Sequence, residues 1–292
     1  MSDRQLPESH LDFLVRELQD DASGIVDFER RRGARLLFHD YYSSFLEGPD
    51  KARRTKRGCM LRRIPMLDFV DDLKARFGPN PRILDVGCGY GTDTMLLAKL
   101  GCRVVAVEPE RDFFTGARHR LKYWRDSLGD CPEPEFLVGT LEELTQLQSR
   151  SFAGIFVSEC LHHCEPVENV LLRMRRLIDL AGRVLALEAN AACLVLMWKR
   201  NRVAARSRRV LVQAGDVYYL WGNENIRTPR QWQRVFHECG FNTTNTHFNH
   251  HVFAELPGFE RAEGLTRPPG AALGAIHVTF VLKPRVPAVT GG

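Results

Sequence analysis

The sequence of 292 residues predicts an α/β fold, with a doubly wound and mostly parallel sheet of seven strands covered by helices. Two observations lead to this prediction. Between residues 80 and 190, short runs rich in Val, Ile and Leu alternate with single amphipathic segments, which is typical of a buried parallel sheet. Near the C-terminus, the alternating patterns of residues 241–256 and 274–284 predict an antiparallel strand pair at one sheet edge.

Residues 1–79 are predicted to be helical and to form a cap or lid region. In residues 9–22, apolar side chains recur at the spacing of one helix face. A second helix is expected over residues 25–46, and a strongly basic run follows at 51–63. The Gly and Pro residues of 78–81 mark the boundary with the next region.

The alternating region predicts five strands separated by helices or loops. The expected strands are 82–87, 103–109, 135–140, 152–159 and 182–190. The expected helices are 92–101, 111–129, 166–178 and, further along the chain, 229–240. With the late strand pair these elements form one domain over 80–190 and 226–284, which leaves 191–225 as an inserted lid and 285–292 as a flexible tail.

A glycine-rich turn joins the first expected strand to its helix. The segment LDVGCGYG places Asp85 at the end of the strand and Gly87, Gly89 and Gly91 before the helix. Glycines there let the backbone approach a ligand closely, because no Cβ stands in the way. Glu108 ends the second strand, where a carboxylate can accept hydrogen bonds from both hydroxyls of a ribose. Strand, turn, helix and acidic residue together predict a nucleoside site.

The details of the turn narrow the choice of ligand. A dinucleotide site carries its third glycine one residue later than Gly91. Asp85 would repel a pyrophosphate and suits a ligand that carries an ammonium or sulfonium charge. The segments LDVGCGYG, VVAVEP, VGTLEEL and FAGIFVSECLHHCEP resemble those of class I, Rossmann-like S-adenosylmethionine-dependent methyltransferases of the small-molecule type. This resemblance covers residues 80–190 and extends, less closely, to 226–284.

The resemblance implies S-adenosylmethionine as the cofactor and S-adenosylhomocysteine as its product. It places the methionine end at the glycine-rich turn, the ribose on Glu108 and the adenine beside Pro109 and residues 140–142. Family members usually carry Asp-Ala in that third segment, so Glu142 is the expected substitute acceptor for the adenine amino group. The residues expected to bind the cofactor are Asp85, Gly87, Cys88, Gly89, Glu108, Pro109, Thr140, Leu141, Glu142 and Ser158.

The segment SECLHHCEP, after the fourth expected strand, holds the candidates for proton transfer. A hydroxyl or carbon nucleophile must lose a proton during methyl transfer, which requires a base such as His, Asp or Glu. The candidates are His162, His163 and Glu159, and for each the alternative is a role in shaping the loop or binding the cofactor. A zinc site with Cys160 and Cys164 is not expected, because four ligands within five residues cannot easily surround one tetrahedral ion.

The inserted segment and the cap supply the candidate substrate contacts. Aromatic rings beside amide and carboxylate tips in DVYYLWGNENIR suit a small organic acceptor, and the alternative is a packed aromatic lid. Between residues 194 and 211 there are six basic residues and no acidic one, which indicates either a solvated lid helix or a basic amphipathic helix against a membrane or an acidic substrate. The residues expected to bind the substrate are Tyr41, Tyr42, Tyr218, Tyr219, Trp221, Asn223, Asn225 and His250.

Three functions remain open from the sequence. The favoured one is methyl transfer to a small molecule such as a sugar or a quinone- or polyketide-like metabolite, with O-methylation slightly ahead of N- and C-methylation. The basic runs at 51–63 and 199–209 favour a nucleic-acid methyltransferase, but SECLHH stands where base-amino methyltransferases carry NPPY or DPPY. The third is a protein that binds the cofactor without catalysis.

Composition adds expectations about location and partners. A net charge of +5 is too small by itself to indicate nucleic acid, and the oligomeric state leaves no trace in the sequence. Eight irregularly spaced cysteines, with no signal peptide in the N-terminal sequence, predict reduced thiols and a cytoplasmic location. No apolar stretch approaches the roughly 18–20 residues that a membrane span needs.

Overall fold

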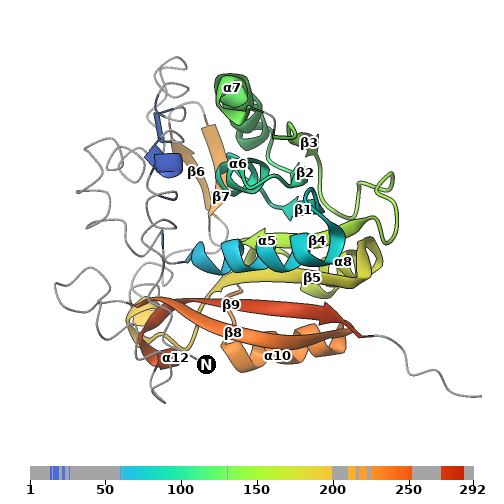
Figure 1. Ribbon diagram of the computed structural model, residues 1–292. Helices are drawn as coiled ribbons and strands as arrows, with labels where there is room; N and C mark the ends of the chain where they lie inside the picture. The colour runs from blue at the N-terminus through green and yellow to red at the C-terminus, as the bar shows by residue number, and fades with distance from the viewer. Residues whose placement is uncertain are drawn as a thin grey trace, which may run out of the picture.

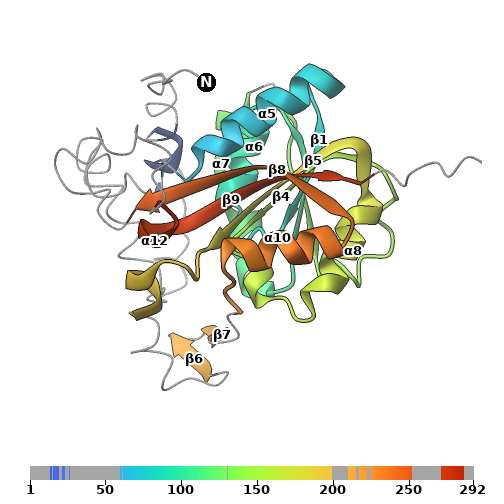
Figure 2. The ribbon, with the colours of Figure 1, turned by 90° about the horizontal axis from the view of Figure 1, so that it is seen from below.

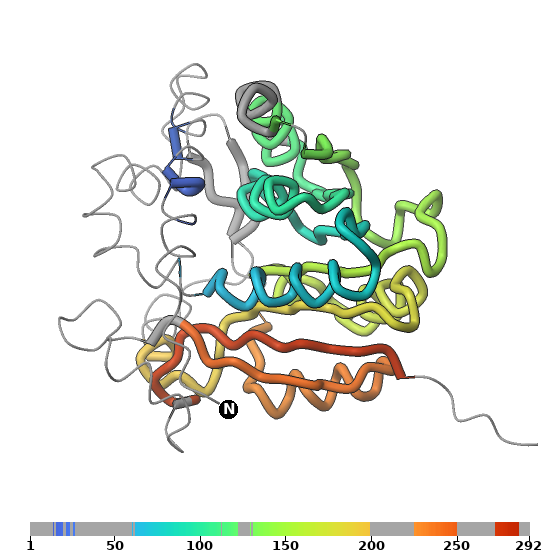
Figure 3. The backbone as a smooth tube through the Cα atoms, in the orientation of Figure 1, coloured from blue at the N-terminus to red at the C-terminus, as the bar shows by residue number. Residues whose placement is uncertain are grey.

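The computed structural model has a central sheet with helices on both sides (Figures 1 and 3). None of its described helices is both long enough and apolar enough to span a membrane. The residues that the structure describes are 14, 16–19, 22–23, 26, 60, 62–129, 131–198, 210–214, 217–221, 225–251 and 271–285.

The central sheet has seven strands in the order β3-β2-β1-β4-β5-β9-β8. Strands β1 to β5 run parallel, and β9 is antiparallel to both of its neighbours, β5 and β8. The predicted sheet, mostly parallel with an antiparallel C-terminal pair, is therefore confirmed. The strands are β1 (Arg82–Val86), β2 (Arg103–Glu108), β3 (Glu135–Val138), β4 (Phe152–Ser158), β5 (Ile178–Ala189), β8 (Phe241–His251) and β9 (Ala275–Pro284).

Helices cover the two faces of the sheet in separate sets (Figure 2). One face carries α5 (Ile64–Phe77), α6 (Thr92–Lys99) and α7 (Arg111–Leu128), whereas the other carries α8 (Val167–Leu177) and α10 (Pro229–Glu238). The strands pack into both cores because successive side chains point to opposite faces. In β1, for example, Ile83 belongs to the core under α5 and α6, and Leu84 to the core under α8 and α10.

The chain order places a topological switch point at the carboxyl ends of β1 and β4. The path runs from β1 outward to β2 and β3, and then returns to β4 on the other side of β1. Between β1 and β4 the connections therefore leave in opposite directions, and ligands of open α/β sheets bind at such a switch point. The short helix η2 (Leu161–His163) follows β4 at this edge.

The described N-terminal residues are helical and pack on α5 and α6. Leu14 and Leu18 are buried in the same core as the apolar side chains of these helices. The carboxylate of Glu17 contacts the Lys99 ammonium of α6, and Arg63 Nε lies 2.6 Å from Asp93 Oδ1. The N-terminal region is thus attached beside the helix that follows the glycine-rich turn, and its role as a cap stays a prediction.

The inserted segment contains a hairpin that the sequence patterns did not indicate. Strands β6 (Val210–Ala214) and β7 (Val217–Trp221) pair antiparallel as a separate two-stranded sheet. The expectation of an amphipathic helix over residues 194–211 is therefore wrong at its C-terminal end. Val210 and Leu211 open a run of β-branched and aromatic residues, whose preference for strands outweighs the helical spacing of the basic segment before them. The basic residues 199–209 lie outside the described residues.

Candidate functional site

The glycine-rich turn lies against the chain that leaves β4. The amides of Gly87 and Cys88 both donate to the carbonyl oxygen of Val107, which fixes the turn on β2. Gly87 has a φ of +70°, and a Cβ at this position would lie 2.3 Å from Cys160 Sγ. Gly89 has a φ of +55°, but no atom lies within 4 Å of the place where its Cβ would be. The first glycine is therefore required by packing, and the second leaves open backbone that a ligand can approach.

Asp85 is a buried acid at the end of β1. Its side chain is 2% exposed, and its Oδ2 accepts a hydrogen bond of 2.5 Å from the Thr94 hydroxyl of α6. Burial raises the pKa of Asp85 from 3.8 to about 7, with a smaller contribution from the nearby negative charges of Asp93 and Glu108. A cationic ligand group at the turn would restore the charged form, because opposite charges stabilise each other strongly where water is excluded.

Glu108 holds the turn from the end of β2. Its Oε2 accepts a hydrogen bond of 2.7 Å from Gly89 N, and its Oε1 accepts one of 3.0 Å from Glu110 N. Burial raises the pKa of this carboxyl group, while the two backbone hydrogen bonds lower it. The side chain therefore reaches the turn, as a ribose-binding residue must. Pro109 follows it and is exposed.

The segment after β3 forms its own local cap. Thr140 N donates to Glu143 Oε2 at 2.9 Å, and Glu143 N donates to Thr140 Oγ1 at 3.3 Å. Leu141 is buried in the core under α8 and α10. Glu142 lines a cavity of about 360 Å³ that is shared with residues of α8. The adenine contacts expected of residues 140–142 stay predictions, and Glu143 is the acid that occupies the backbone donor of Thr140.

Ser158 and Glu159 end β4 at the same edge. Ser158 is half-buried, and the backbone of Glu159 has a φ of +53°. This left-handed conformation is unfavourable for a residue with a Cβ, and such residues cluster at functional sites. Glu159 N donates to Leu187 O at 2.8 Å, and its Oε1 lies 3.4 Å from His277 Nε2 of β9. Glu159 therefore faces His277 across the end of β5.

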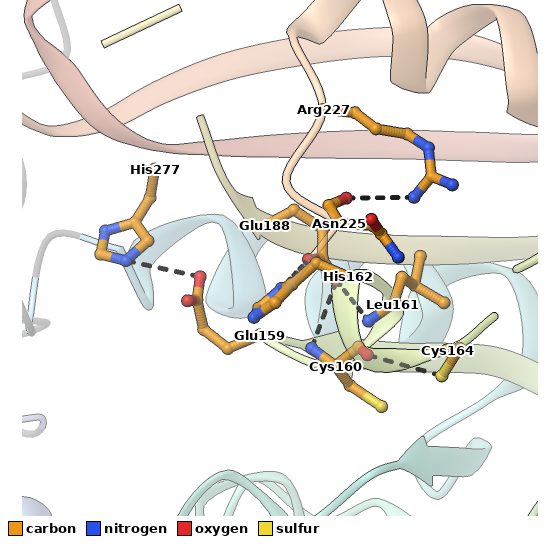
Figure 4. A network of polar contacts seen from close by, with 9 residues as sticks. All are labelled: Glu159, Cys160, Leu161, His162, Cys164, Glu188, Asn225, Arg227 and His277. Atoms are coloured by element: carbon orange, nitrogen blue, oxygen red, sulfur yellow. Dashed lines mark hydrogen bonds and ion pairs between the residues drawn. The ribbon is translucent and has the colours of Figure 1, made fainter. Parts of the chain in front are cut away.

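The two expected histidines differ in their environments (Figure 4). His162 is buried, and its Nδ1 lies 2.6 Å from Oε2 of Glu188, whose side chain is completely buried. The other oxygen, Oε1, accepts from Leu161 N at 2.8 Å and from Cys160 N at 3.3 Å. His163 is exposed, and its ring lies 4.1 Å from the His162 ring, centroid to centroid. The pair is thus divided into one buried histidine with a carboxylate partner and one at the surface.

The cysteines of the same loop take part in packing and local hydrogen bonds. Cys160 Sγ lies against Gly87, and Cys164 Sγ donates to the carbonyl oxygen of Cys160 at 3.5 Å. Cys88 lies in the glycine-rich turn, and burial raises the pKa of its thiol well above the usual range. Among the described residues, no three His, Cys, Asp or Glu side chains are grouped closely enough to hold a metal ion.

Most of the expected substrate residues fall outside what the structure describes. Tyr41, Tyr42 and Asn223 lie outside the described residues, and the side chains of Tyr218, Tyr219 and Trp221 on β7 and of His250 on β8 are also outside them. Asn225 is described: its N donates to His162 O at 2.8 Å, so the end of the inserted segment touches the loop after β4.

Sequence reasoning missed Glu188 and His277. Glu188 lies near the carboxyl end of the strand pattern GRVLALEAN, and β5 pairs in parallel with β4. Acidic residues at the carboxyl ends of neighbouring parallel strands meet at one edge, so this position was a detectable signal. His277 reaches the edge from an antiparallel strand, whose register against β5 is invisible in the sequence.

Comparisons with known proteins agree with this fold. A family model described as a methyltransferase domain matches residues 84–186. A ubiquinone biosynthesis O-methyltransferase from Hahella chejuensis (strain KCTC 2396) is 30% identical over 111 residues, which are 38% of this chain and 43% of that protein. A demethylmenaquinone methyltransferase from Tropheryma whipplei (strain Twist) is 25% identical over 182 residues, covering 56% and 67% of the two chains. The chain thus spans less than half the length of the first of these relatives.

Solved structures add the fold. The geranyl diphosphate C-methyltransferase from Streptomyces coelicolor A3(2), in complex with Mg²⁺, geranyl diphosphate and S-adenosyl-L-homocysteine, superposes with a TM-score of 0.52 at 14% identity. The superposition covers 76% of this chain and 77% of that one. Residues 84–186 are therefore similar to a methyltransferase domain, and the sheet that carries them has the Rossmann-like fold.

Proposed function

We propose that the protein binds S-adenosylmethionine at the turn after β1 and transfers its methyl group to a small-molecule acceptor. The observation that carries the proposal is the turn itself, where Gly89 leaves open backbone, Glu108 reaches its amide, and the buried Asp85 ends the strand before it. Two acids and an open glycine suit a ligand with a cationic end and a ribose. S-adenosylmethionine combines both with a methyl group activated by a sulfonium leaving group.

The residues of this chain have distinct roles in that proposal. Asp85 supplies a negative charge for the cationic methionine end. Burial holds its pKa near 7, so a bound cation stabilises the ionised form of this carboxyl group. Glu108 accepts hydrogen bonds from the ribose hydroxyls, which replace those that the backbone amides of Gly89 and Glu110 donate to it. The loop after β4 orients the acceptor and keeps water out, which is most of what an in-line methyl transfer requires.

We infer that the acceptor is a hydroxylated ring of the quinone class. This inference is supported by the names of two relatives, one in ubiquinone biosynthesis and one that methylates demethylmenaquinone. It is also supported by the His162–Glu188 pair, because a hydroxyl must lose a proton during transfer. We further infer a cytoplasmic location, which fits the free thiols of the seven described cysteines. Contact of the basic residues 199–209 with an acidic partner stays a prediction.

The test is a transfer assay with a deuterated methyl group. The protein is incubated with S-(trideuteromethyl) cofactor and a panel of ring hydroxyl, amine and carbon acceptors, and mass spectrometry follows both S-adenosylhomocysteine and the labelled product. We expect label on a ring hydroxyl, at least tenfold less label with Glu108→Ala, and unchanged label with the exposed control Glu135→Gln. Formation of neither product with any acceptor, despite binding of the cofactor, would indicate a binding protein without catalysis.

A further inference from the structure

We propose that Glu188 is a positioning residue that holds His162 with its proton on Nδ1, which makes Nε2 the nitrogen that takes the proton of the acceptor hydroxyl. The inference rests on the proposed methyl transfer and deepens it, because it selects one of the two neighbouring histidines and supplies the group that orients it. The residues involved come from the ends of β4 and β5 and from η2 (Figure 4).

If Glu188 is ionised, its hydrogen bonds decide which nitrogen of His162 carries the proton. Its Oε1 is used by the backbone donors of Leu161 and Cys160, and its Oε2 lies 2.6 Å from His162 Nδ1. An ionised carboxylate can only accept hydrogen bonds, so Nδ1 must be the donor. A neutral imidazole carries one proton, and Nε2 is then the proton-accepting nitrogen.

Burial makes this orientation strict. The Glu188 side chain is completely buried and that of His162 is 6% exposed, so water cannot replace either partner without a large cost. The two backbone donors fix the carboxylate in turn, because they hold its plane against the η2 segment. His163 differs in burial, because its side chain is exposed beside the His162 ring.

The second acid–histidine pair at this edge is looser. Glu159 Oε1 lies 3.4 Å from His277 Nε2, beyond the normal length of a charge-assisted hydrogen bond. The Glu159 side chain is 31% exposed as a whole, although its Oε1 is itself buried. A short contact to a fully buried carboxylate orients an imidazole better than a longer contact, which favours His162 over His277 as the proton acceptor.

The loop that carries His162 contacts both regions that the proposal assigns to the cofactor and the acceptor. Cys160, two residues before it, packs against Gly87 of the turn that is proposed to hold the cofactor. From the other side, Asn225 N donates to His162 O at 2.8 Å, at the end of the inserted segment that is predicted to be the lid. In Figure 4 the His162 ring meets the Glu188 carboxylate at Nδ1, and Glu159 lies beyond the ring on the side away from Glu188 in this view. The loop after β4 thus touches both the glycine-rich turn and Asn225.

The step balances with these groups alone. The acceptor oxygen forms a bond to the methyl carbon, and the bond from that carbon to sulfur breaks with its electron pair going to sulfur. The acceptor proton goes to His162 Nε2, and the resulting imidazolium is stabilised by the Glu188 carboxylate at Nδ1.

The tautomer of His162 is the first measurement, because it needs no substrate. The full-length protein, labelled with ¹⁵N-histidine, is studied by long-range ¹H–¹⁵N correlation at a pH at which the ring is neutral, and the His162→Gln variant assigns the signal among the ten histidines. We expect the proton on Nδ1 in the wild type. In Glu188→Gln, the amide oxygen stays on the two backbone donors and its NH₂ group faces Nδ1, so we expect the proton to move to Nε2.

Turnover is the second measurement. Loss of a correctly oriented general base reduces rates by about 10²–10⁴-fold, so Glu188→Gln and His162→Gln should each lower kcat on the best ring hydroxyl by that amount. The double variant should fall no further, because the two residues act as one unit. The cofactor Kd should change less than about twofold, and the exposed control Glu168→Gln should leave kcat unchanged.

The outcomes separate this inference from the proposed function. A wild-type proton on Nε2, or a Glu188→Gln variant that keeps both its fold and its turnover, would overturn the role of Glu188. If Glu188→Gln does not fold, the wild-type tautomer and the His162→Gln rate still decide. Absence of cofactor binding by the wild type would instead refute the proposed function, whatever the tautomer.

Discussion

At the scale of single residues, Asp85 connects the site with the stability of the fold. Burial raises its pKa to about 7, whereas the same group in an unfolded chain keeps its ordinary value of 3.8. The folded protein therefore binds this proton more tightly than the unfolded chain does. The resulting stabilisation is complete below pH 4 and is lost as the pH rises from about 4 to about 7.

The Asp85→Asn variant should remove this loss. Relative to the variant, the wild type should lose on the order of a few kcal/mol of unfolding free energy between pH 5 and pH 8, because each unit of pKa shift is worth about 1.36 kcal/mol. Urea unfolding of both proteins at the two pH values measures the difference. Equal pH dependence in both would contradict the assignment of the buried proton to Asp85.

Two glycines of the turn should respond differently to alanine. Gly87→Ala places a methyl group 2.3 Å from Cys160 Sγ, so the loop after β4 must shift, and we expect a cost of about 2–4 kcal/mol from the clash and the left-handed backbone together. Gly89→Ala meets no atom within 4 Å, so only the backbone cost of about 1 kcal/mol applies.

For Gly89→Ala, we expect a larger effect on cofactor affinity than on stability. If its backbone is the surface that the ligand approaches, Gly89→Ala should lower the affinity for S-adenosylmethionine at least tenfold although it barely changes stability. Chemical unfolding and titration calorimetry on the same two variants give both quantities. Unchanged affinity for S-adenosylmethionine in Gly89→Ala would contradict binding of the ligand at the turn.

The cofactor residues were more accessible to sequence reasoning than the catalytic ones. Asp85 and Glu108 follow from a turn pattern and a fixed spacing along the chain, and the structure brings both to the turn. The difference between His162 and His163 depends on Glu188, which approaches from a neighbouring strand. Adjacent histidines look alike in a sequence, and only the packing of η2 against β5 decides which one is buried.

At the scale of elements, α10 shows where local patterns are sufficient. Thr228 Oγ1 accepts from Gln231 N at 3.3 Å, and Gln231 Oε1 accepts from Thr228 N at 2.8 Å, which is a complete capping box. Trp232 and Phe236 then pack into the core with no exposed surface. The predicted helix began correctly because capping residues act over a single turn.

Loss of this cap has a predictable cost. Thr228→Ala should destabilise the protein by about 1 kcal/mol, the usual value for an N-cap threonine, and should lower the urea midpoint without changing the slope m. The exposed neighbour Arg230→Ala is the matched control and should leave the midpoint unchanged. A midpoint shift as large in the control as in Thr228→Ala would show that the cap contributes nothing of its own.

The inserted hairpin shows where local patterns mislead. Helical spacing of apolar residues across 194–211 competed with the strand preference of the residues from Val210 onward, and pairing of β6 with β7 decided in favour of the strand. A strand is stabilised by a partner elsewhere in the chain, so a window of one segment cannot reveal it.

At the scale of the whole molecule, the sheet unites residues that are far apart in the sequence. The mostly parallel sheet with an antiparallel C-terminal pair was implied by the alternation of strands and helices together with the resemblance to known methyltransferases, whereas the order of its strands comes from the structure. The contacts of Glu17 with Lys99 and of Arg63 with Asp93 were not, because they join the N-terminal region to α6 through charged side chains without a periodic pattern. The edge that carries Asp85, Glu108, Glu159, His162 and Glu188 is thus a product of topology.

Binding of S-adenosylmethionine tests the central claim most directly. Titration calorimetry of the full-length wild type should show one site, with binding that S-adenosylhomocysteine displaces and that Glu108→Ala weakens at least tenfold. The affinity of the wild type should rise between pH 6 and pH 8 as Asp85 ionises, and that of Asp85→Asn should not. No binding of either compound by folded wild-type protein, or equal binding by the wild type and both variants, would contradict the account.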